Sequence, residues 1–153
     1  MSKIIIHGGF FSESSTNIET KIAKQQALLR IVKDSYAYLQ NHSALETVVY
    51  AVSQLEDDEL FNAGIGSQIQ SDGKIRMSAS LMDGESQKMS GVINIEEVKN
   101  PIQVAQVLMQ VDDRILGGSG ATNFARKHGF EPFLTEIPQR RTEYEAKLAS
   151  LGT

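Results

Sequence analysis

The chain has 153 residues, 41% of them hydrophobic and 22% charged, which is the composition of an ordinary globular domain long enough to build its own core. Its net charge of −4 argues against nucleic-acid binding through a basic surface and against a polybasic membrane anchor. The chain has no cysteine, which excludes a disulfide scaffold, a thiolate zinc site and a cysteine nucleophile.

The N-terminal segment predicts a buried strand. Lys3–His7 holds three isoleucines in a row and is followed by Gly8-Gly9, a pattern typical of a strand buried on both faces that ends in a sharp turn. Three isoleucines are too few for an export signal, and no apolar run approaches the roughly 20 residues of a membrane span. We therefore expect a cytoplasmic protein of mixed α/β structure.

Two amphipathic helices are predicted next. A capping box at Thr16–Glu19 begins a helix that runs to about Gln40, and a second capping box at Ser43–Glu46 begins a helix that runs to Leu55. Because the link between them is only Asn41-His42, we expect the two helices to pack antiparallel.

Strand and helix patterns then alternate. Gln68–Gln70 and Lys74–Met82 flank the turn Ser71-Asp72-Gly73 and predict a hairpin, and Gly91–Ile95 predicts a further strand. Asn100-Pro101 predicts a helix start with Asn100 as the capping side chain. The helix it starts buries an apolar face that extends to Val111, and a brief strand is expected at Arg114–Leu116.

Gly117-Gly118-Ser119-Gly120 leads into a short predicted helix, Ala121–His128, with Gly129 placed to cap its C-terminus. Helix N-termini bind anions, so one hypothesis is a non-enzymatic anion- or nucleotide-binding module at Gly117–Gly120. This segment lacks the Lys-Ser/Thr ending of a P-loop and the spacing of a dinucleotide fingerprint. A tight strand-to-helix connection is the alternative.

The tail beyond Glu131 holds two of the three prolines and a thin apolar stripe, which predicts a mobile or loosely docked segment.

The acidic run Glu56–Glu59 follows the second helix, at the end where the helix dipole already disfavours negative charge. One interpretation is a solvated surface loop. The other is a loop wrapped around a cation, with backbone carbonyls as ligands and with Gly64 and Gly66 allowing the turns.

Asn62 has two interpretations as well, a local turn former or an amide that orients a group in an active site. His7, beside the glycine pair, is the one histidine of functional interest.

Several segments occur in the order found in one known family. They are His7-Gly8-Gly9, Leu55-Glu56, Leu60–Gly66, Ala79–Gly84, Asn100-Pro101 and Gly120-Ala121. Together they resemble the plant-type L-asparaginases, also called isoaspartyl peptidases, over about residues 3–130. The Phe-Asn-Ala-Gly-x-Gly element at residues 61–66 carries most of the resemblance.

The resemblance implies an N-terminal nucleophile hydrolase of α+β class, with a four-layer αββα sandwich. In that family the precursor cuts itself before a threonine, whose hydroxyl becomes the nucleophile and whose own amino group is the general base. This chain would be the α subunit, with residues 1–130 in the sandwich and residues 131–153 forming a flexible linker. That linker leads to the self-cleavage region at Gly152 and Thr153. Thr153 would lie just before the cut, or would itself be the nucleophile.

The implied partner is a separate β chain, giving αβ pairs that dimerise to (αβ)2. The implied reaction is hydrolysis of β-aspartyl dipeptides and L-asparagine, releasing L-aspartate. The same fold also serves glycosylasparaginases, which are usually exported. The absence of a signal segment and of cysteine favours the isoaspartyl peptidase.

The resemblance also assigns roles within the loop. The main-chain oxygens of six residues would bind a structural sodium ion: Leu55, Glu56, Asp58, Phe61, Ala63 and Ile65. Asn62 would support the nucleophile's surroundings, and no residue of this chain would perform the bond chemistry. Two positions depart from the family pattern, Phe10-Phe11 in place of a glycine-rich loop and Ser78 in place of an acidic residue.

Overall fold

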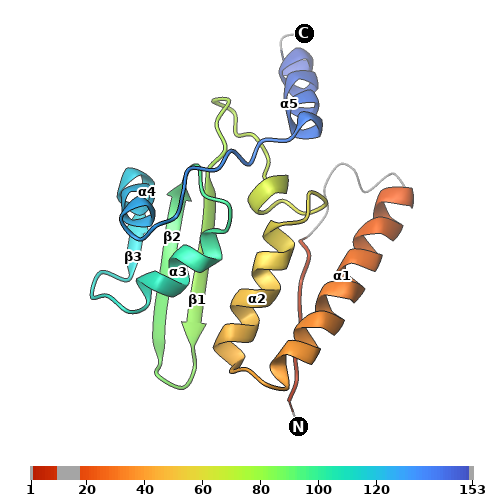
Figure 1. Cartoon of the computed structure of the whole chain (residues 1–153). Coiled ribbons are helices and arrows are strands. Elements are labelled where there is room, and N and C mark those ends of the chain that lie inside the picture. The colour runs from red at the N-terminus through yellow and green to blue at the C-terminus, as the bar shows by residue number, and fades with distance from the viewer. Residues whose placement is uncertain (1, 10–17, 152–153) are drawn as a thin grey trace.

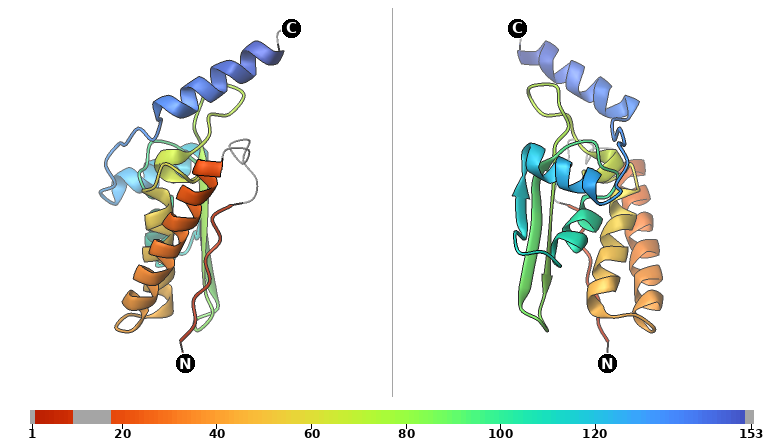
Figure 2. Two further views of the ribbon diagram at one scale, coloured as in Figure 1. Left: turned by 90° about the vertical axis from the view of Figure 1, so that its right-hand side faces the viewer. Right: turned by 60° about the vertical axis from the view of Figure 1, so that its left-hand side comes forward.

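The computed structural model describes residues 2–9 and 18–151 (Figure 1). Its helices and strands follow one another as α1 (Ile18–Leu39), α2 (Ala44–Glu56), a 3₁₀ turn (Gly64–Gly66), β1 (Met77–Asp83), β2 (Lys88–Ile95), α3 (Pro101–Leu108), β3 (Ile115–Gly117), α4 (Gly118–Lys127) and α5 (Pro138–Leu151). This is an α+β arrangement in which helices gather on one side of a small sheet (Figures 1 and 2).

The sheet has the order β1-β2-β3, with β1 and β2 antiparallel and β2 and β3 parallel. The predicted turn at Ser71–Gly73 is present, but the predicted hairpin pairing is wrong. β1 pairs with β2, and Gln68–Gln70 forms no strand. The physical reason is burial. Leu81 of β1 and Val92 of β2 are buried against the helices, whereas the arm Gln68–Gln70 has little apolar surface to bury.

The antiparallel pair α1 and α2 is confirmed. The Ser43 hydroxyl accepts a hydrogen bond from the Glu46 amide, and the Glu46 carboxylate accepts one from the Ser43 amide, which completes the predicted capping box. The other predicted cap, Thr16, lies outside the described residues. The buried residues Ala27 and Ile31 of α1 form a cluster with Phe61 from the loop after α2.

The N-terminal prediction is wrong for the described residues. Lys3–His7 belongs to no strand, and the Ile5 side chain is 93% exposed. Ile6 instead packs against the α1 cluster. Figures 1 and 2 place this extended segment beside α1 and α2, in the same layer as the sheet but separated from β1. It is not buried on both faces because no described strand lies beside it.

Helix α3 is confirmed, but its cap is not Asn100. The Asn100 side chain makes no capping hydrogen bond to α3 and donates instead to the Asp57 carboxylate and to the Ser53 carbonyl. The capping acceptor is Glu56, whose Oε1 lies 3.1 Å from the amide nitrogen of Ile102. A side chain 46 residues away in the sequence therefore does the work that the local pattern assigned to Asn100.

Helix α4 begins at Gly118, directly after β3, so Gly118–Gly120 forms its first turn. This is the tight strand-to-helix connection that the sequence suggested. Gly129 has φ of +82° just beyond the helix, in the left-handed conformation expected of a C-terminal glycine.

The last described helix, α5, extends away from the other elements (Figure 2). The segment before it is attached through the buried Thr135 and Ile137, and Arg140 is the one buried residue within it. Among the described residues, none of the helices is long and apolar enough to cross a membrane.

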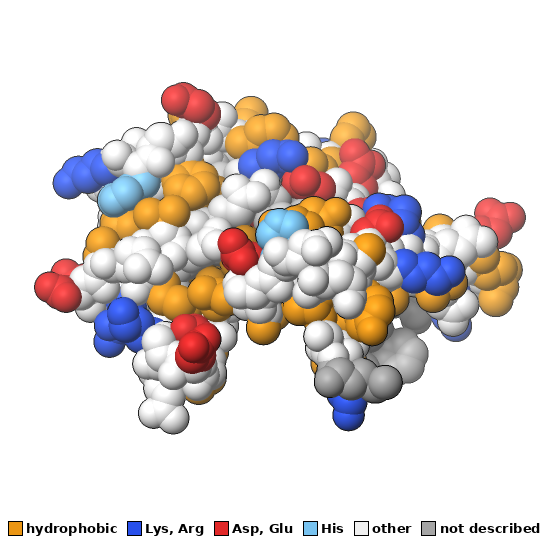
Figure 3. Space-filling model, turned by 60° about the horizontal axis from the view of Figure 1, so that its bottom comes forward, with side chains coloured by type: hydrophobic (Ala, Val, Ile, Leu, Met, Phe, Trp, Pro, Cys, Tyr) orange, Lys and Arg blue, Asp and Glu red, His pale blue; other side chains and the backbone are white. Residues whose placement is uncertain are grey.

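One face of the sheet carries no helix in the described structure (Figure 2). Four large apolar side chains are about half exposed or more there: Met82, Met89, Ile93 and Ile115. Between them lie small residues, since Gly91 pairs with both Ser80 and Ile115 across the sheet. Seen from its lower end, hydrophobic side chains gather along the lower edge of the molecule (Figure 3). A single helical layer and a single strand layer are therefore present, which is half of the expected four-layer sandwich.

Candidate active-site cavity

Three segments that are distant in the sequence meet at one cavity of about 350 Å³. The N-terminal segment contributes His7–Gly9, the loop after α2 contributes Asn62 and its neighbours, and α5 contributes Arg140. Lys24 of α1 and Gln68 complete the polar lining. Two of the segments selected from the sequence, His7–Gly9 and Leu60–Gly66, are thus brought together in space.

Close packing explains the first glycine of the pair. A Cβ atom on Gly8 would lie 2.8 Å from side-chain atoms of both Leu28 and Phe61, so the backbone approaches the α1 cluster as only glycine allows. Gly9 adopts φ of +93°, and its amide donates to Nδ1 of His7 over 3.3 Å. This turn places the His7 ring at the edge of the cavity.

Asn62 closes the next loop. Its Oδ1 accepts a hydrogen bond from the Gln68 amide over 2.9 Å, across the 3₁₀ turn. Within the turn, the Gly66 amide donates to the Ala63 carbonyl. Asn62 is therefore a loop former, as one interpretation proposed, and it also lines the cavity, as the other interpretation requires.

The carbonyl oxygens of this loop crowd its two glycines. A Cβ on Gly64 would lie 2.1 Å from the Glu56 carbonyl oxygen. A Cβ on Gly66 would lie 2.0 Å from the carbonyl oxygen of Phe61. Backbone oxygens from opposite sides of the loop are thus gathered around residues that cannot carry a side chain.

The acidic run is not a uniformly solvated loop, because three of its members have specific partners. Asp57 pairs with Lys99 over 3.0 Å, and Asp58 pairs with Arg30 of α1 over 3.1 Å. Glu56 is buried at 3% exposure and caps α3. The run therefore joins the end of α2 to both neighbouring helices.

Burial raises the pKa of the Glu56 carboxyl to about 8, although the Ile102 amide and the Asn100 side chain favour its ionised form. Its second oxygen, Oε2, has no hydrogen-bond partner among the described residues. A protonated Oε2 at neutral pH removes the cost of burying an unpaired charge.

The family resemblance assigns six main-chain oxygens to a sodium ion, and three of these oxygens already accept turn hydrogen bonds. No group of three or more histidine, aspartate or glutamate side chains in the described chain could hold a metal, so a cation here depends on backbone oxygens. The carbonyls of Asp58 and Ala63 each accept one turn hydrogen bond and keep a second lone pair, whereas the Leu55 carbonyl accepts from the amides of both Asp57 and Asp58. No described backbone amide donates to the remaining three carbonyls, those of Glu56, Phe61 and Ile65.

The described lining of the cavity offers groups that bind but no nucleophile. It contains a histidine, a lysine, an arginine and two side-chain amides, with no serine, threonine or cysteine. Sequence reasoning missed Lys24, Gln68 and Arg140, since a lysine on an amphipathic helix and an arginine in a polar tail follow ordinary surface patterns. Gly152, Thr153 and Phe10-Phe11 lie outside the described residues.

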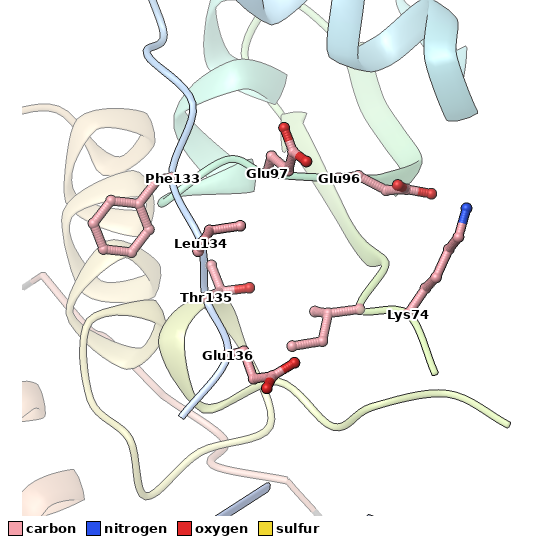
Figure 4. Close-up of a pocket in the computed structure, with 8 residues that line it drawn as sticks. Lys74, Glu96, Glu97, Phe133, Leu134, Thr135 and Glu136 are labelled. Carbon is pink, nitrogen blue, oxygen red and sulfur yellow. The ribbon is translucent and has the colours of Figure 1, made fainter. Parts of the chain in front are cut away.

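A second cavity of about 320 Å³ lies between the end of β2 and the segment before α5 (Figure 4). Three glutamates line this cavity, but each has an arginine partner: Glu96 with Arg76, Glu97 with Arg126, and Glu136 with Arg141. These carboxylates are neutralised within the chain, so they do not form a vacant cation site.

Known proteins of one family resemble this chain over most of its length. A family model described as asparaginase matches residues 1–149. The isoaspartyl peptidase/L-asparaginase of Synechocystis sp. is 49% identical over 127 residues, covering 82% of this chain and 38% of that protein. The corresponding protein of Nostoc sp. is 46% identical over 140 residues, 88% of this chain and 43% of that protein. The plant-type L-asparaginase of Pyrococcus furiosus is 39% identical, covering 95% of this chain and 47% of its own length. The chain therefore spans less than half the length of these relatives.

Proposed function

The chain belongs to the asparaginase family, and we propose that it is the α-subunit part of an isoaspartyl peptidase with L-asparaginase activity. The whole enzyme hydrolyses β-aspartyl dipeptides and the side-chain amide of L-asparagine, and it releases L-aspartate. This chain supplies the support around the reacting atoms, and a second chain supplies the nucleophile.

One observation carries this proposal: the cavity that joins His7–Gly9 to Asn62 has polar binding groups but no described nucleophile. A threonine at the start of a β chain completes it. The threonine hydroxyl attacks the β-carbonyl carbon, its proton passes to the threonine amine, and the departing amine takes that proton. Water then hydrolyses the β-aspartyl-threonine ester. Asn62, fixed by its hydrogen bond from the Gln68 amide, supports the threonine's surroundings.

The open sheet supports a β chain as partner. β1 is an edge strand, and the extended segment Lys3–His7 lies in the same layer with no described strand beside it (Figure 2). The backbone N–H and C=O groups of both segments can pair with strands from another chain. The apolar face at Met82, Ile93 and Ile115 then packs against a second sheet, which completes the αββα sandwich. Two such αβ pairs form the (αβ)2 assembly.

A sodium ion bound by the loop Leu55–Ile65 belongs to the same proposal. Main-chain ligands from Leu55, Glu56, Asp58, Phe61, Ala63 and Ile65 are supported by the carbonyls gathered around Gly64 and Gly66. The ion offsets the negative helix end and the acidic run, and it holds Asn62 at the cavity.

The test uses the full-length gene product. Mass spectrometry is expected to find two chains, the second beginning with threonine, and both a β-aspartyl dipeptide and L-asparagine are expected to be hydrolysed. Replacing that first threonine with alanine should leave a single uncut, inactive chain. A full-length protein that stays uncut yet hydrolyses these substrates would overturn the proposal, and preference for a glycosylasparagine would reassign it to the glycosylasparaginases.

A further inference from the structure

Arg140 is a buried charge in a helix whose other residues are exposed or half-buried. It is 5% exposed, and it is the one buried residue of α5. Its neighbour Arg141 is 38% exposed at its side chain and pairs with Glu136 at the surface. A guanidinium is costly to remove from water unless its N–H groups are satisfied, so the partners of Arg140 indicate what holds it there.

Those partners link two segments of the chain. Nε of Arg140 donates to the carbonyl oxygen of Gly66 over 2.8 Å, and Nη1 donates to the Glu143 carboxylate over 2.7 Å. Burial opposes ionisation of Glu143, but hydrogen bonds from Arg140 and Gln139 outweigh it and lower the pKa of this carboxyl. The pair is therefore charged at neutral pH, and the bond to Gly66 is charge-assisted.

The Gly66 carbonyl is a rigid point of attachment. On one side Gly66 lies against the Phe61 carbonyl, where a Cβ would be only 2.0 Å away. Its amide is bonded to the Ala63 carbonyl, and Asn62 closes the loop around it. The position of this carbonyl thus depends on the same loop that gathers the proposed cation ligands.

Little else holds α5. The Tyr144 hydroxyl donates to the Ser71 carbonyl over 3.4 Å, near the upper limit of a hydrogen bond. Lys24 of α1 also attracts the Glu143 carboxylate electrostatically, and the described side-chain hydrogen bonds of Gln139, Arg141 and Thr142 stay within α5 or reach Glu136, directly before it. Arg140 therefore makes the strongest described contact between α5 and the site.

We propose that Arg140 is a positioning residue that latches α5 onto the Gly66 carbonyl, so that cation binding in the loop Leu55–Ile65 and the docking of α5 are coupled. The proposal rests on the proposed function for the cation and for self-cleavage after α5. When the loop is ordered, its carbonyl is presented to Arg140 and α5 is held. When the loop loosens, the latch opens and α5 is released.

The test compares Arg140→Lys with Arg141→Lys in full-length protein kept uncut by replacing its nucleophile threonine. Both variants keep the charge, but only the first alters the bond to Gly66. A glutamate-specific protease cuts after Glu143 and Glu145 in either variant, so it reports how firmly α5 is held. We expect sodium to slow this cutting about tenfold or more in the parent and in Arg141→Lys, relative to lithium. In Arg140→Lys the cutting should be fast in both salts.

A second measurement is self-cleavage in the processing-competent protein, where Arg140→Lys should be at least about tenfold slower and Arg141→Lys within about twofold of the parent. Equal protease sensitivity of the two variants, or an unchanged sodium effect in Arg140→Lys, would overturn the latch. If the parent neither binds sodium nor cuts itself, the proposed function fails instead. The difference between the two variants in protease cutting still decides whether Arg140 holds α5.

Discussion

Oε1 of Glu56 accepts a hydrogen bond from the amide of Ile102 over 3.1 Å, so a carboxyl at the end of α2 caps the start of α3. This contact satisfies an amide at the N-terminus of α3 that has no partner within its own helix. It also fixes the position of the loop that begins at Glu56, because the same residue both caps α3 and borders Gly64.

The Glu56 contact predicts a specific pH dependence of stability. Burial raises the pKa of Glu56 in the folded protein to about 8 from its ordinary value of 4.5, so the folded protein binds more protons between these values. The stabilisation is complete below about pH 4.5 and is lost as the pH rises through about 8. Glu56→Gln keeps an acceptor for Ile102 and cannot ionise, so we expect it to match the parent near pH 5 and to be more stable near pH 8. Urea unfolding at fixed sodium concentration measures this.

The matched control is Glu59→Gln, which makes the same change of charge at an exposed position of the same loop. Its unfolding free energy should run parallel to that of the parent, displaced by less than about 0.5 kcal/mol. A pH slope in Glu56→Gln equal to the parent's would show that Glu56 does not titrate as its burial requires.

Local patterns predicted much of the secondary structure but not the contacts that organise the site. The capping box at Ser43, the helix start at Pro101 and the C-terminal glycine Gly129 follow from short-range chemistry, and each is present. The Glu56 cap and the Arg140 contact join residues 46 and 74 positions apart, and no spacing rule connects them. The six sodium ligands and the role of Asn62 came from the family resemblance, since backbone ligands leave almost no mark on side-chain identity.

The failed strand prediction has a different cause. Ile4–Ile6 has strand composition, but pairing requires a neighbouring strand, and no described segment provides one. A strand is stabilised by its neighbours, so its sequence can be right while its partner is in another chain.

Gly64 is expected to tolerate no side chain. It has φ of +52°, and a Cβ would lie 2.1 Å from the backbone oxygen of Glu56, which cannot move aside as a flexible side chain would. We expect Gly64→Ala to lower the free energy of unfolding by more than about 2 kcal/mol. Gly84→Ala, where a Cβ would meet nothing within 4 Å, should change it by less than about 0.5 kcal/mol. Chemical denaturation of both variants makes the comparison, and similar losses would show that the loop is more plastic than its carbonyl packing implies.

The proposed cation site predicts a dependence on ion identity. In the full-length protein, the Tm should be higher in sodium chloride than in lithium chloride of equal ionic strength, because a ligand that binds the folded state stabilises it. Asp58→Asn should keep this difference, since the proposed ligand is the backbone oxygen of Asp58. Its side chain instead contacts Arg30 and the Leu60 amide. Loss of the sodium effect in Asp58→Asn would assign binding to the carboxylate, and no ion effect in the parent would exclude the site.

The open face of the sheet predicts an assembly defect from a single charge. Ile93 on that face is 51% exposed, and Leu29 on α1 is 54% exposed, so the two side chains have nearly the same exposure in the described chain. If a second sheet covers Ile93, then Ile93→Lys buries an unpaired charge in the full-length protein. The cost in free energy of assembly is on the order of several kcal/mol. We expect Ile93→Lys to reduce the yield of assembled, active protein more than about tenfold, and Leu29→Lys to stay within about twofold of the parent. Size-exclusion chromatography with the β-aspartyl dipeptide assay measures both, and equal yields of the two variants would mean that this face stays open in the assembled enzyme.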